Sequence, residues 1–275
     1  MSPGIKAKKG KIRADQAMLE RGLAQSLEEA RAFIMAGELL AGDQRISKPS
    51  DMIEPETSLR IKNDTRAHYV SRGGDKIAAA SEALGLNQIF RDAIVIDVGS
   101  STGGFTDFCL KAGATHVIAV DVGHNQLAWE LRKDPRVTLF ESTHIKHLPD
   151  EARAAHKSDI VSKANVMVAD VSFNSVARLL PEMLAAAPAT EHFLILVKPQ
   201  FELEAALVPA GGVVTNPGHR KLAVDNVDQA FRKNGFPGGR WIDSPVPGKT
   251  GNVEIFYYNR RKSQPATRAR AEDKQ

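Results

Sequence analysis

Short apolar runs separated by helix-length segments place the strongest constraint on how this chain folds. They span residues 94–98, 116–121, 137–140, 166–170 and 193–198. Each run has the length of a buried strand, and connections of helix length are what join parallel strands. The pattern is typical of an α/β fold with a doubly wound, mostly parallel sheet covered on both faces. Two later runs, 240–242 and 254–258, predict a terminal antiparallel pair.

The first 62 residues have a different pattern, which predicts a small unit of helices and short strands. A helix is expected over residues 13–21. A second helix begins at Ser26, where Ser-Leu-Glu-Glu forms a capping box, and ends at Gly37, a residue that readily adopts the left-handed C-cap conformation. Alternating apolar residues between 39 and 61 then predict short strands.

These patterns divide the chain into four parts. They are a small N-terminal unit with a basic arm (1–62), a linker and helix carrying Lys76 (63–92), the α/β domain (93–259) and a basic tail that we expect to be disordered (260–275). The positive charge lies at the two ends: residues 1–13 hold five Lys or Arg and no acid, whereas the whole chain has a net charge of only +4. Basic arms contact phosphate backbones or remain solvated tails, and composition leaves both possibilities open.

The sequence gives no sign of a membrane or secreted protein. No apolar run approaches the ~20 residues of a membrane span, and no apolar segment follows the basic start as in a signal peptide. A single cysteine, Cys109, cannot form an internal disulfide. We therefore expect a cytoplasmic protein with no membrane partner. We also expect no metal site, because His144 and His147 lack further ligands at suitable spacing.

A glycine-rich turn follows the first strand of the α/β domain, in the sequence Asp97-Val98-Gly99-Ser100-Ser101-Thr102-Gly103-Gly104-Phe105. Such a turn lies at the carboxyl ends of the strands, where ligands bind to open α/β sheets. Its spacing differs from the G-x-G-x-x-G of dinucleotide sites, and Phe105 stands where a P-loop needs lysine. S-adenosylmethionine is the remaining ligand class. The alternative is that the glycines only form a tight turn.

The S-adenosylmethionine interpretation gives a role to an acid on each side of the turn. Asp97 would fix the amino group of the methionine part. Asp121, at the end of the next strand, would accept hydrogen bonds from the ribose diol. The predicted cofactor-binding residues are Asp97, Gly99, Ser101, Thr102, Gly103, Gly104, Phe105 and Asp121.

Four charged side chains are expected at the same edge of the sheet. Asp170 and Lys198 end apolar strands, Glu254 opens the last strand, and Lys76 lies near the start of the helix before the first one. Each alone is compatible with an exposed surface charge. A lysine with a pKa of ~10.4 accepts no proton near pH 7, but a neighbouring cation and desolvation lower that pKa. Two lysines with two orienting carboxylates therefore predict activation of a hydroxyl for in-line methyl transfer.

The motifs DVGSSTGGFTD, DVSF, KPQFE and GNVE, with SRGGDK ahead of them, resemble the TlyA family over about residues 10–258. Its members are known as haemolysin A or as ribosomal RNA 2′-O-methyltransferases. The resemblance implies an N-terminal RNA-binding domain of the ribosomal-protein S-four type and an FtsJ-like, Rossmann-like class I methyltransferase domain. It also implies a catalytic tetrad of Lys76, Asp170, Lys198 and Glu254. The implied reaction methylates ribose, typically of cytidine in small- or large-subunit RNA, with S-adenosylmethionine as the donor.

The resemblance implies that the N-terminal unit docks ribosomal RNA or ribosomal subunits through phosphate contacts. The predicted RNA-binding residues are Arg13, Arg21, Arg31 and Lys48. Phe173 and Phe201 each follow a tetrad residue closely in the sequence. We expect core packing for both rings, with stacking on a flipped base as the alternative.

Three other functions stay open at this stage. One is a membrane-active haemolysin, as the family's older name suggests, although no basic amphipathic helix supports it. Another is an RNA-binding module with a non-catalytic methyltransferase scaffold, and the third is methylation of a protein or small molecule. Within the tetrad, Lys198 is expected to activate the hydroxyl, and Lys76 is able to exchange roles with it. The target nucleotide and the oligomeric state do not follow from the sequence.

Overall fold

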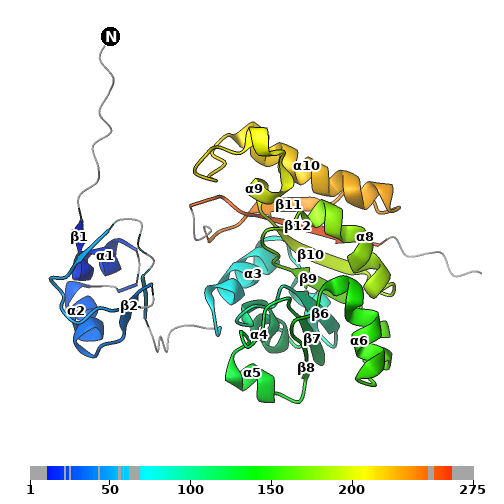
Figure 1. The fold of residues 1–275 in the computed structure, drawn as a ribbon, viewed down its shortest axis with the longest axis horizontal. Helices are drawn as coiled ribbons and strands as arrows, with labels where there is room; N and C mark the ends of the chain where they lie inside the picture. The colour runs from blue at the N-terminus through cyan, green and yellow to red at the C-terminus, as the bar shows by residue number, and fades with distance from the viewer. Residues whose placement is uncertain are drawn as a thin grey trace, which may run out of the picture. The chain divides into compact units, whose positions relative to one another are not determined.

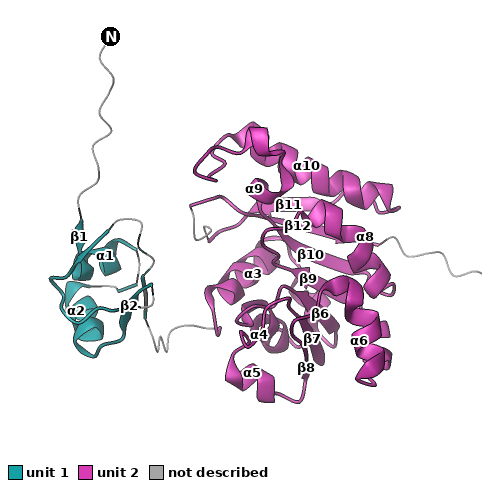
Figure 2. Cartoon of the chain, viewed as in Figure 1, with its two compact units in different colours: residues 1–67 teal, residues 68–275 magenta. Residues whose placement is uncertain are grey.

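The chain forms two compact units, Met1–Ala67 and His68–Gln275 (Figure 2). This computed structural model describes residues 11–21, 23–24, 26–42, 44–54, 57, 59–61, 69–246 and 251–261. The predicted end of the small unit, at residue 62, lies inside the first unit. Helix α3 (Arg72–Ala83), which carries Lys76, belongs to the second unit rather than to a separate linker segment. The predicted tail lies outside the described residues from position 262 onward.

The first unit packs two helices on short strands. Its elements are β1 (Ile12–Arg13), α1 (Ala14–Glu20), α2 (Leu27–Met35), β2 (Leu39–Ala41), β3 (Gln44–Arg45), β4 (Met52–Ile53) and β5 (Leu59–Ile61). Strand β1 pairs with β4, and β3, β2 and β5 form a second sheet. The capping box operates at α2, where the Ser26 hydroxyl accepts the Glu29 N–H at 3.1 Å. Gly37 follows the helix with a φ of 72° and gives the left-handed ending expected from the sequence.

The second unit is built on a mostly parallel sheet, which confirms the predicted fold class. Its strands are β6 (Ile94–Val98), β7 (His116–Val120), β8 (Val137–Phe140), β9 (Val166–Ala169), β10 (His192–Val197), β11 (Arg240–Asp243) and β12 (Ile255–Arg260). They lie in the order β11-β12-β10-β9-β6-β7-β8. Strand β12 runs antiparallel to both β10 and β11, and the other pairings are parallel. The terminal antiparallel pair is therefore present.

Helices cover both faces of this sheet because its strands are apolar on both sides (Figure 1). The helical elements are α3, η1 (Asn87–Phe90), α4 (Gly104–Lys111), α5 (Trp129–Lys133), η2 (Ile145–His147), α6 (Leu148–Ala154), α7 (Ser158–Ser162), α8 (Val176–Ala186), α9 (Pro199–Glu202), η3 (Ala205–Leu207) and α10 (Pro217–Lys233). Alternate strand residues face two cores. Ile96 and Met167 pack with α8 and α10, whereas Val95 and Val168 pack with α3 and α4. None of the described helices has the length and apolar character needed to cross a membrane.

The order of the strands reverses between β6 and β9. The chain passes from β6 to β7 on one side, then returns after β8 to place β9 on the other side of β6. Ligands bind to open α/β sheets at such a reversal, beyond the carboxyl ends of the strands. The glycine loop follows β6 and Asp170 follows β9, so both lie at this point.

Candidate active site

Two ion pairs lie at the carboxyl edge of the sheet. Lys76 reaches from α3 to Glu254, with 2.5 Å between Nζ and Oε2, and both side chains are almost wholly buried. Lys198, directly after β10, lies 2.6 Å from Oδ1 of the half-buried Asp170. Lys198 also donates a hydrogen bond to the Ser172 hydroxyl at 2.8 Å, a contact not expected from the sequence.

Strand register brings the two ion pairs together. Val197, the last residue of β10, lies opposite Ile255, the first residue of the antiparallel β12. Lys198 follows Val197 and Glu254 precedes Ile255, so the same register places the two charged residues beside each other. The four residues predicted as a tetrad therefore converge, although they come from α3 and from the ends of three strands.

Asp97 is a fully buried carboxyl group at the end of β6. The Thr106 hydroxyl donates to its Oδ2 at 2.6 Å, and its Oδ1 has no hydrogen-bond partner among the described residues. Burial, reinforced by the carboxylates of Asp170 and Asp121, raises the pKa of Asp97 to about 7. A buried acceptor without a partner costs free energy, so Asp97 is suited to receive a donor from a ligand.

Gly99 lets the loop after β6 pass directly against the loop that carries Asp170. Its φ is +81°, and a Cβ at this position would lie 2.5 Å from the Asp170 carbonyl oxygen. At the other side of the loop, the Ser101 N–H donates to Oδ2 of Asp121 at 2.7 Å. The Gly123 N–H donates to Oδ1 of the same carboxylate at 2.6 Å. Asp121 is therefore fixed by backbone donors and retains lone pairs for a ligand diol.

A pocket of about 390 Å³ opens between these loops. Its walls include Gly99, Ser101, Asp121, Asp170, Ser172, Gln126, Thr143 and His144. The volume lies within the ~300–1,000 Å³ range of small-molecule sites. It joins the predicted ligand loop to one of the ion pairs, so a ligand held there would lie next to the tetrad.

Five of the predicted cofactor residues do not line this pocket: the buried Asp97 described above, and Thr102, Gly103, Gly104 and Phe105. The last four have other contacts. A Cβ on Gly103 would lie 2.3 Å from Leu131, and a Cβ on Gly104 would lie 2.3 Å from the Ser71 hydroxyl and 2.7 Å from the Gly74 nitrogen. Phe105 is buried and stacks on Phe256 at 6.1 Å. The carbonyl of Thr102 accepts the Ala128 N–H at 3.1 Å. In the structure these residues hold the loop against α3 and α5.

Phe173 lies on the loop after β9 with its ring 89% exposed, so the core-packing expectation is wrong for this residue. Its φ of +65° belongs to the left-handed region that phenylalanine rarely adopts, and here it accompanies an outward-pointing ring. Phe201 is half-buried, with 5.6 Å between the two ring centroids. The exposed ring directly follows Ser172, the hydrogen-bond partner of Lys198, and it lines the smaller pocket together with Asp170.

The predicted RNA-binding residues occupy the surface of the first unit. Arg13 holds the buried Asp15 through two hydrogen bonds, at 3.0 and 2.8 Å, and Arg31 contacts the same carboxylate at 3.1 Å. The hydrogen bond from Arg13 is the main cause that lowers the pKa of Asp15 to about 2. Arg21 donates to the Thr57 carbonyl, and Lys48 is exposed. The sequence did not indicate that Arg13 and Arg31 both bind Asp15, because the contact of Arg31 joins two different helices.

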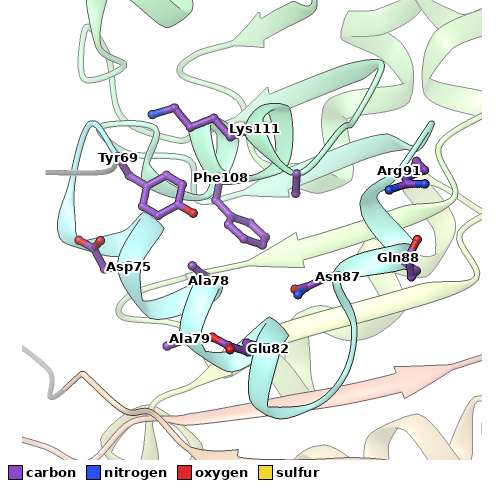
Figure 3. A pocket seen from close by; sticks show the side chains of 11 residues that line it. Tyr69, Asp75, Ala78, Ala79, Glu82, Asn87, Gln88, Arg91, Phe108 and Lys111 are labelled. Carbon is purple, nitrogen blue, oxygen red and sulfur yellow. The ribbon is translucent and has the colours of Figure 1, made fainter.

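A second pocket, of about 620 Å³, lies between α3, η1 and α4 and is separate from the tetrad (Figure 3). Tyr69 and Phe108 form an aromatic wall with 5.8 Å between ring centroids, and Lys111 lies over the Tyr69 ring at 5.1 Å. Asp75, Glu82 and Arg91 add charges of both signs at the rim. None of the tetrad or glycine-loop residues lines this pocket.

The described residues contain no group of three or more potential ligands that could hold a metal ion. The histidine pair singled out in the sequence has another environment: His144 Nδ1 lies 3.4 Å from Glu182, and the two imidazole rings are 6.5 Å apart.

Residues 69–261, which include the whole candidate site, match the model of the FtsJ-like methyltransferases. Among curated proteins, the chain is 37% identical to the 16S/23S rRNA (cytidine-2′-O)-methyltransferase TlyA of Mycobacterium tuberculosis, over 94% of each chain. It is 32% identical to Hemolysin A of Brachyspira hyodysenteriae, over 89% of this chain and 98% of that one. The similarity to these relatives therefore covers both units.

Solved structures show the same similarity. A solved structure from Streptococcus thermophilus that bears the name hemolysin aligns with a TM-score of 0.67 and 32% identity, and the alignment covers 93% of this chain and 90% of the other. A second structure with that name, from Lactococcus lactis, aligns with a TM-score of 0.63 and 32% identity over 72% of this chain and 91% of its own.

Proposed function

Because the chain belongs to the FtsJ-like methyltransferase family and, within it, to the TlyA proteins, we propose that it methylates ribose 2′-hydroxyls of ribosomal RNA with S-adenosylmethionine as the donor. The observation that carries the proposal is the pair of Lys–carboxylate contacts, Lys76–Glu254 and Lys198–Asp170, beside the pocket at the strand reversal. The name of the Mycobacterium tuberculosis relative specifies cytidine in 16S and 23S RNA, and we propose the same acceptor class here.

The residues around the smaller pocket fit S-adenosylmethionine. Gly99 lines the pocket and lets its loop lie directly against the backbone of Asp170, and Asp121 presents a fixed carboxylate suited to a ribose diol. The unpartnered Oδ1 of Asp97 suits an ammonium donor. When bound, the cofactor supplies a methyl group already activated by a positively charged sulfur. The protein must then activate and align the oxygen that receives it.

Lys198 is the residue that we assign to the acceptor hydroxyl. Asp170 and Ser172 both contact its Nζ, so the amine is held in one orientation next to the pocket. In the proposed step the neutral amine form of Lys198 accepts a hydrogen bond from the 2′-hydroxyl and takes its proton, while the hydroxyl oxygen bonds to the methyl group and the methyl–sulfur bond of the donor breaks. Lys198 then passes that proton to solvent. Lys76, fixed by Glu254, lies beside it as a second cation and balances the charge of the carboxylates.

The exposed ring of Phe173 is placed to hold the acceptor nucleotide. A ribose hydroxyl reaches buried catalytic groups more easily once its nucleotide leaves the stack, and an aromatic face stabilises an unstacked base. Phe173 follows Ser172 directly and lies against Phe201, so a base on this ring would have its ribose near Lys198.

The first unit, in which Arg13 and Arg31 are held by Asp15, would bind RNA phosphates in the cytoplasm, where ribosomes assemble.

The test is transfer of labelled methyl groups to ribosomal subunits that lack the modification. Wild type should label the RNA in a form that survives alkaline hydrolysis as a resistant dinucleotide. Lys198→Ala should abolish labelling. Lys163→Ala, which removes a surface lysine paired with Asp159, is the matched control and should leave labelling unchanged.

Two outcomes would overturn the proposal. If wild type binds the cofactor but labels neither subunit nor free RNA, the acceptor is not ribosomal RNA or the scaffold only binds. If Lys198→Ala labels as well as wild type, the assigned proton acceptor is wrong. Lysis of liposomes by the pure protein at low concentration would instead support the haemolysin function that the names of some relatives suggest.

A further inference from the structure

Glu202 is a buried acid that the proposed reaction leaves without a role. It lies at the end of α9, four positions after Lys198 in the sequence Lys-Pro-Gln-Phe-Glu, and is only 8% exposed. Its Oε1 accepts the Val176 N–H at 2.6 Å. Its Oε2 accepts the Ser175 hydroxyl at 2.6 Å and the Ala177 N–H at 3.3 Å. Burial raises the pKa of this carboxyl group.

These hydrogen bonds connect the two loops that form the reactive centre. The donors belong to the first turn of α8 and the residue before it, immediately after the loop that carries Asp170, Ser172 and Phe173. Glu202 itself belongs to the segment that begins at Lys198. Its main chain is anchored in turn, because the Asn226 side chain of α10 donates to the Glu202 carbonyl at 3.0 Å. The carboxylate therefore fixes the distance between the segment of Lys198 and the loop of its partners.

The helix cap alone does not explain this arrangement. Ser175 already accepts the Arg178 N–H at 3.3 Å and satisfies the helix end in the ordinary way. A buried carboxylate costs desolvation free energy, and burial raises the pKa of Glu202 although its hydrogen bonds and the charge of Arg178 lower it. The N-terminus of the 11-residue helix α8 offsets part of that cost through its dipole. Because burying this carboxylate costs free energy, its presence here suggests that it serves the exact placement of the neighbouring loop rather than stability.

We propose that Glu202 is a positioning residue for methyl transfer, which holds the Asp170–Phe173 loop in register with Lys198 through the first turn of α8. This inference rests on the proposed function for its activity readout. It concerns the alignment of Lys198 with Asp170, Ser172 and Phe173, and Glu202 itself need not touch the cofactor or the RNA.

The activity test compares Glu202→Ala, Glu202→Gln and the control Glu204→Gln, an exposed acid on the same segment. With folded enzyme at saturating cofactor and RNA, Glu202→Ala should lower kcat by about 100-fold, the scale expected for a misplacement of about 1 Å. KM for RNA and Kd for the cofactor should stay within about threefold of wild type. Glu202→Gln should recover part of kcat, because its amide oxygen accepts the Val176 N–H and its NH2 group donates to the Ser175 hydroxyl, whereas the Ala177 N–H loses its acceptor.

A merely structural role gives a different result: the melting temperature of Glu202→Ala falls while kcat per folded enzyme stays at the wild-type value. That result would overturn the inference. If wild type and Glu204→Gln transfer no methyl group at all, the proposed function fails, and hydrogen exchange decides the positioning role independently. Backbone amides of residues 171–177 should exchange about tenfold faster in Glu202→Ala, with strands β9 and β10 unchanged. Equal protection of this segment in both proteins would refute the role of Glu202.

Discussion

Variants of Lys76 and Glu254 test how far each of these two charges depends on the other for the stability of the folded chain. Both side chains are almost wholly buried and their charged atoms are 2.5 Å apart. Removing one partner leaves the other charge buried and uncompensated, which costs about 3–5 kcal/mol, whereas replacing both is often neutral. We expect Lys76→Met to lose stability on that scale in urea unfolding and the double variant with Glu254→Met to recover most of it. Neither variant should transfer methyl groups.

The control for this comparison is Lys221→Met, since Lys221 pairs with Asp225 on the exposed face of α10. A solvated pair contributes ~1 kcal/mol or less, so this variant should unfold close to wild type. Equal losses for Lys76→Met and Lys221→Met would contradict a buried, interdependent pair at the site.

The raised pKa of Asp97 predicts how the free energy of unfolding and the affinity for the cofactor change with pH. Its folded-state pKa is about 7, against 3.8 in the ordinary state, so the folded chain holds this proton more tightly than the unfolded chain does. Its contribution to the free energy of unfolding is therefore complete below about pH 4 and is lost as the pH rises through about 7, a change on the order of 4 kcal/mol. The ionised form is the better partner for an ammonium group, so cofactor affinity should rise over the same interval.

Urea unfolding at several pH values, for wild type and Asp97→Asn, isolates this carboxyl group from others that titrate. The free energy difference between the two proteins should change steadily between pH 4 and 8. A difference independent of pH would show that Asp97 titrates normally and would remove the physical basis for its assigned role.

Phe173 allows acceptor binding to be separated from folding. Its ring is 89% exposed, so Phe173→Ala should leave the melting temperature almost unchanged. If the ring stacks on the acceptor base, its loss should weaken methyl transfer by about 1–3 kcal/mol, roughly 5- to 150-fold in kcat/KM. Phe173→Trp should retain activity. Trp129→Ala, another exposed aromatic but on α5, serves as the comparison and should not reproduce the loss.

Among the elements, the contact between α3 and α4 determines where Lys76 lies. Gly104 begins α4, and a Cβ there would meet the Ser71 hydroxyl at 2.3 Å and the Gly74 nitrogen at 2.7 Å. Gly104→Ala must therefore move the start of α3, at a cost of about 1–3 kcal/mol, and should reduce methyl transfer more than it reduces stability. Circular dichroism melts and the labelling assay measure the two effects.

Gly211→Ala is the suitable control, because a Cβ at Gly211 would meet no heavy atom within 4 Å. Both substitutions add the same methyl group. If only Gly104→Ala loses activity, the loss is therefore due to the displacement of α3. An active Gly104→Ala enzyme would show that α3 tolerates the shift and that the position of Lys76 is not restrictive.

The strands, and the position of charged residues at their carboxyl ends, were predictable because the signal is local; the catalytic role of the tetrad stays a prediction. An apolar run that ends in a polar residue indicates both a strand and its carboxyl edge, as at Asp170 and Lys198, and parallel strands align those edges. Glu202 gave no such signal, because its hydrogen-bond partner Val176 lies 26 positions away. Gly104 was predicted only as a cofactor residue, because its contact with Ser71, 33 positions away, has no local signal. Phe173 was misassigned because an aromatic residue after a buried strand usually packs inward, whereas in the structure this residue is 89% exposed on a loop with a left-handed backbone conformation.

At the scale of the whole molecule, the two units have separate cores and separate proposed tasks. Ala14, Met18, Ile34 and Leu39 belong to a cluster of buried residues formed by the first unit alone. The second unit has its own two cores and holds every residue of the tetrad and the glycine loop. A chain that begins at residue 62 should therefore fold, melt cooperatively and bind the cofactor with a Kd within about twofold of the full chain.

That chain retains Val70, whose N–H donates to Asp107 at 2.8 Å at the start of the second unit. Methylation of ribosomal subunits should nevertheless fall by roughly 100-fold or more, because tethering to a bound RNA unit raises the effective concentration of the catalytic unit by that order. Raising the subunit concentration should restore part of the rate, and adding the separate N-terminal unit should not. If the shortened chain methylates subunits as efficiently as the full one, the first unit is not the docking module, and recognition of RNA must come from the surface around Phe173.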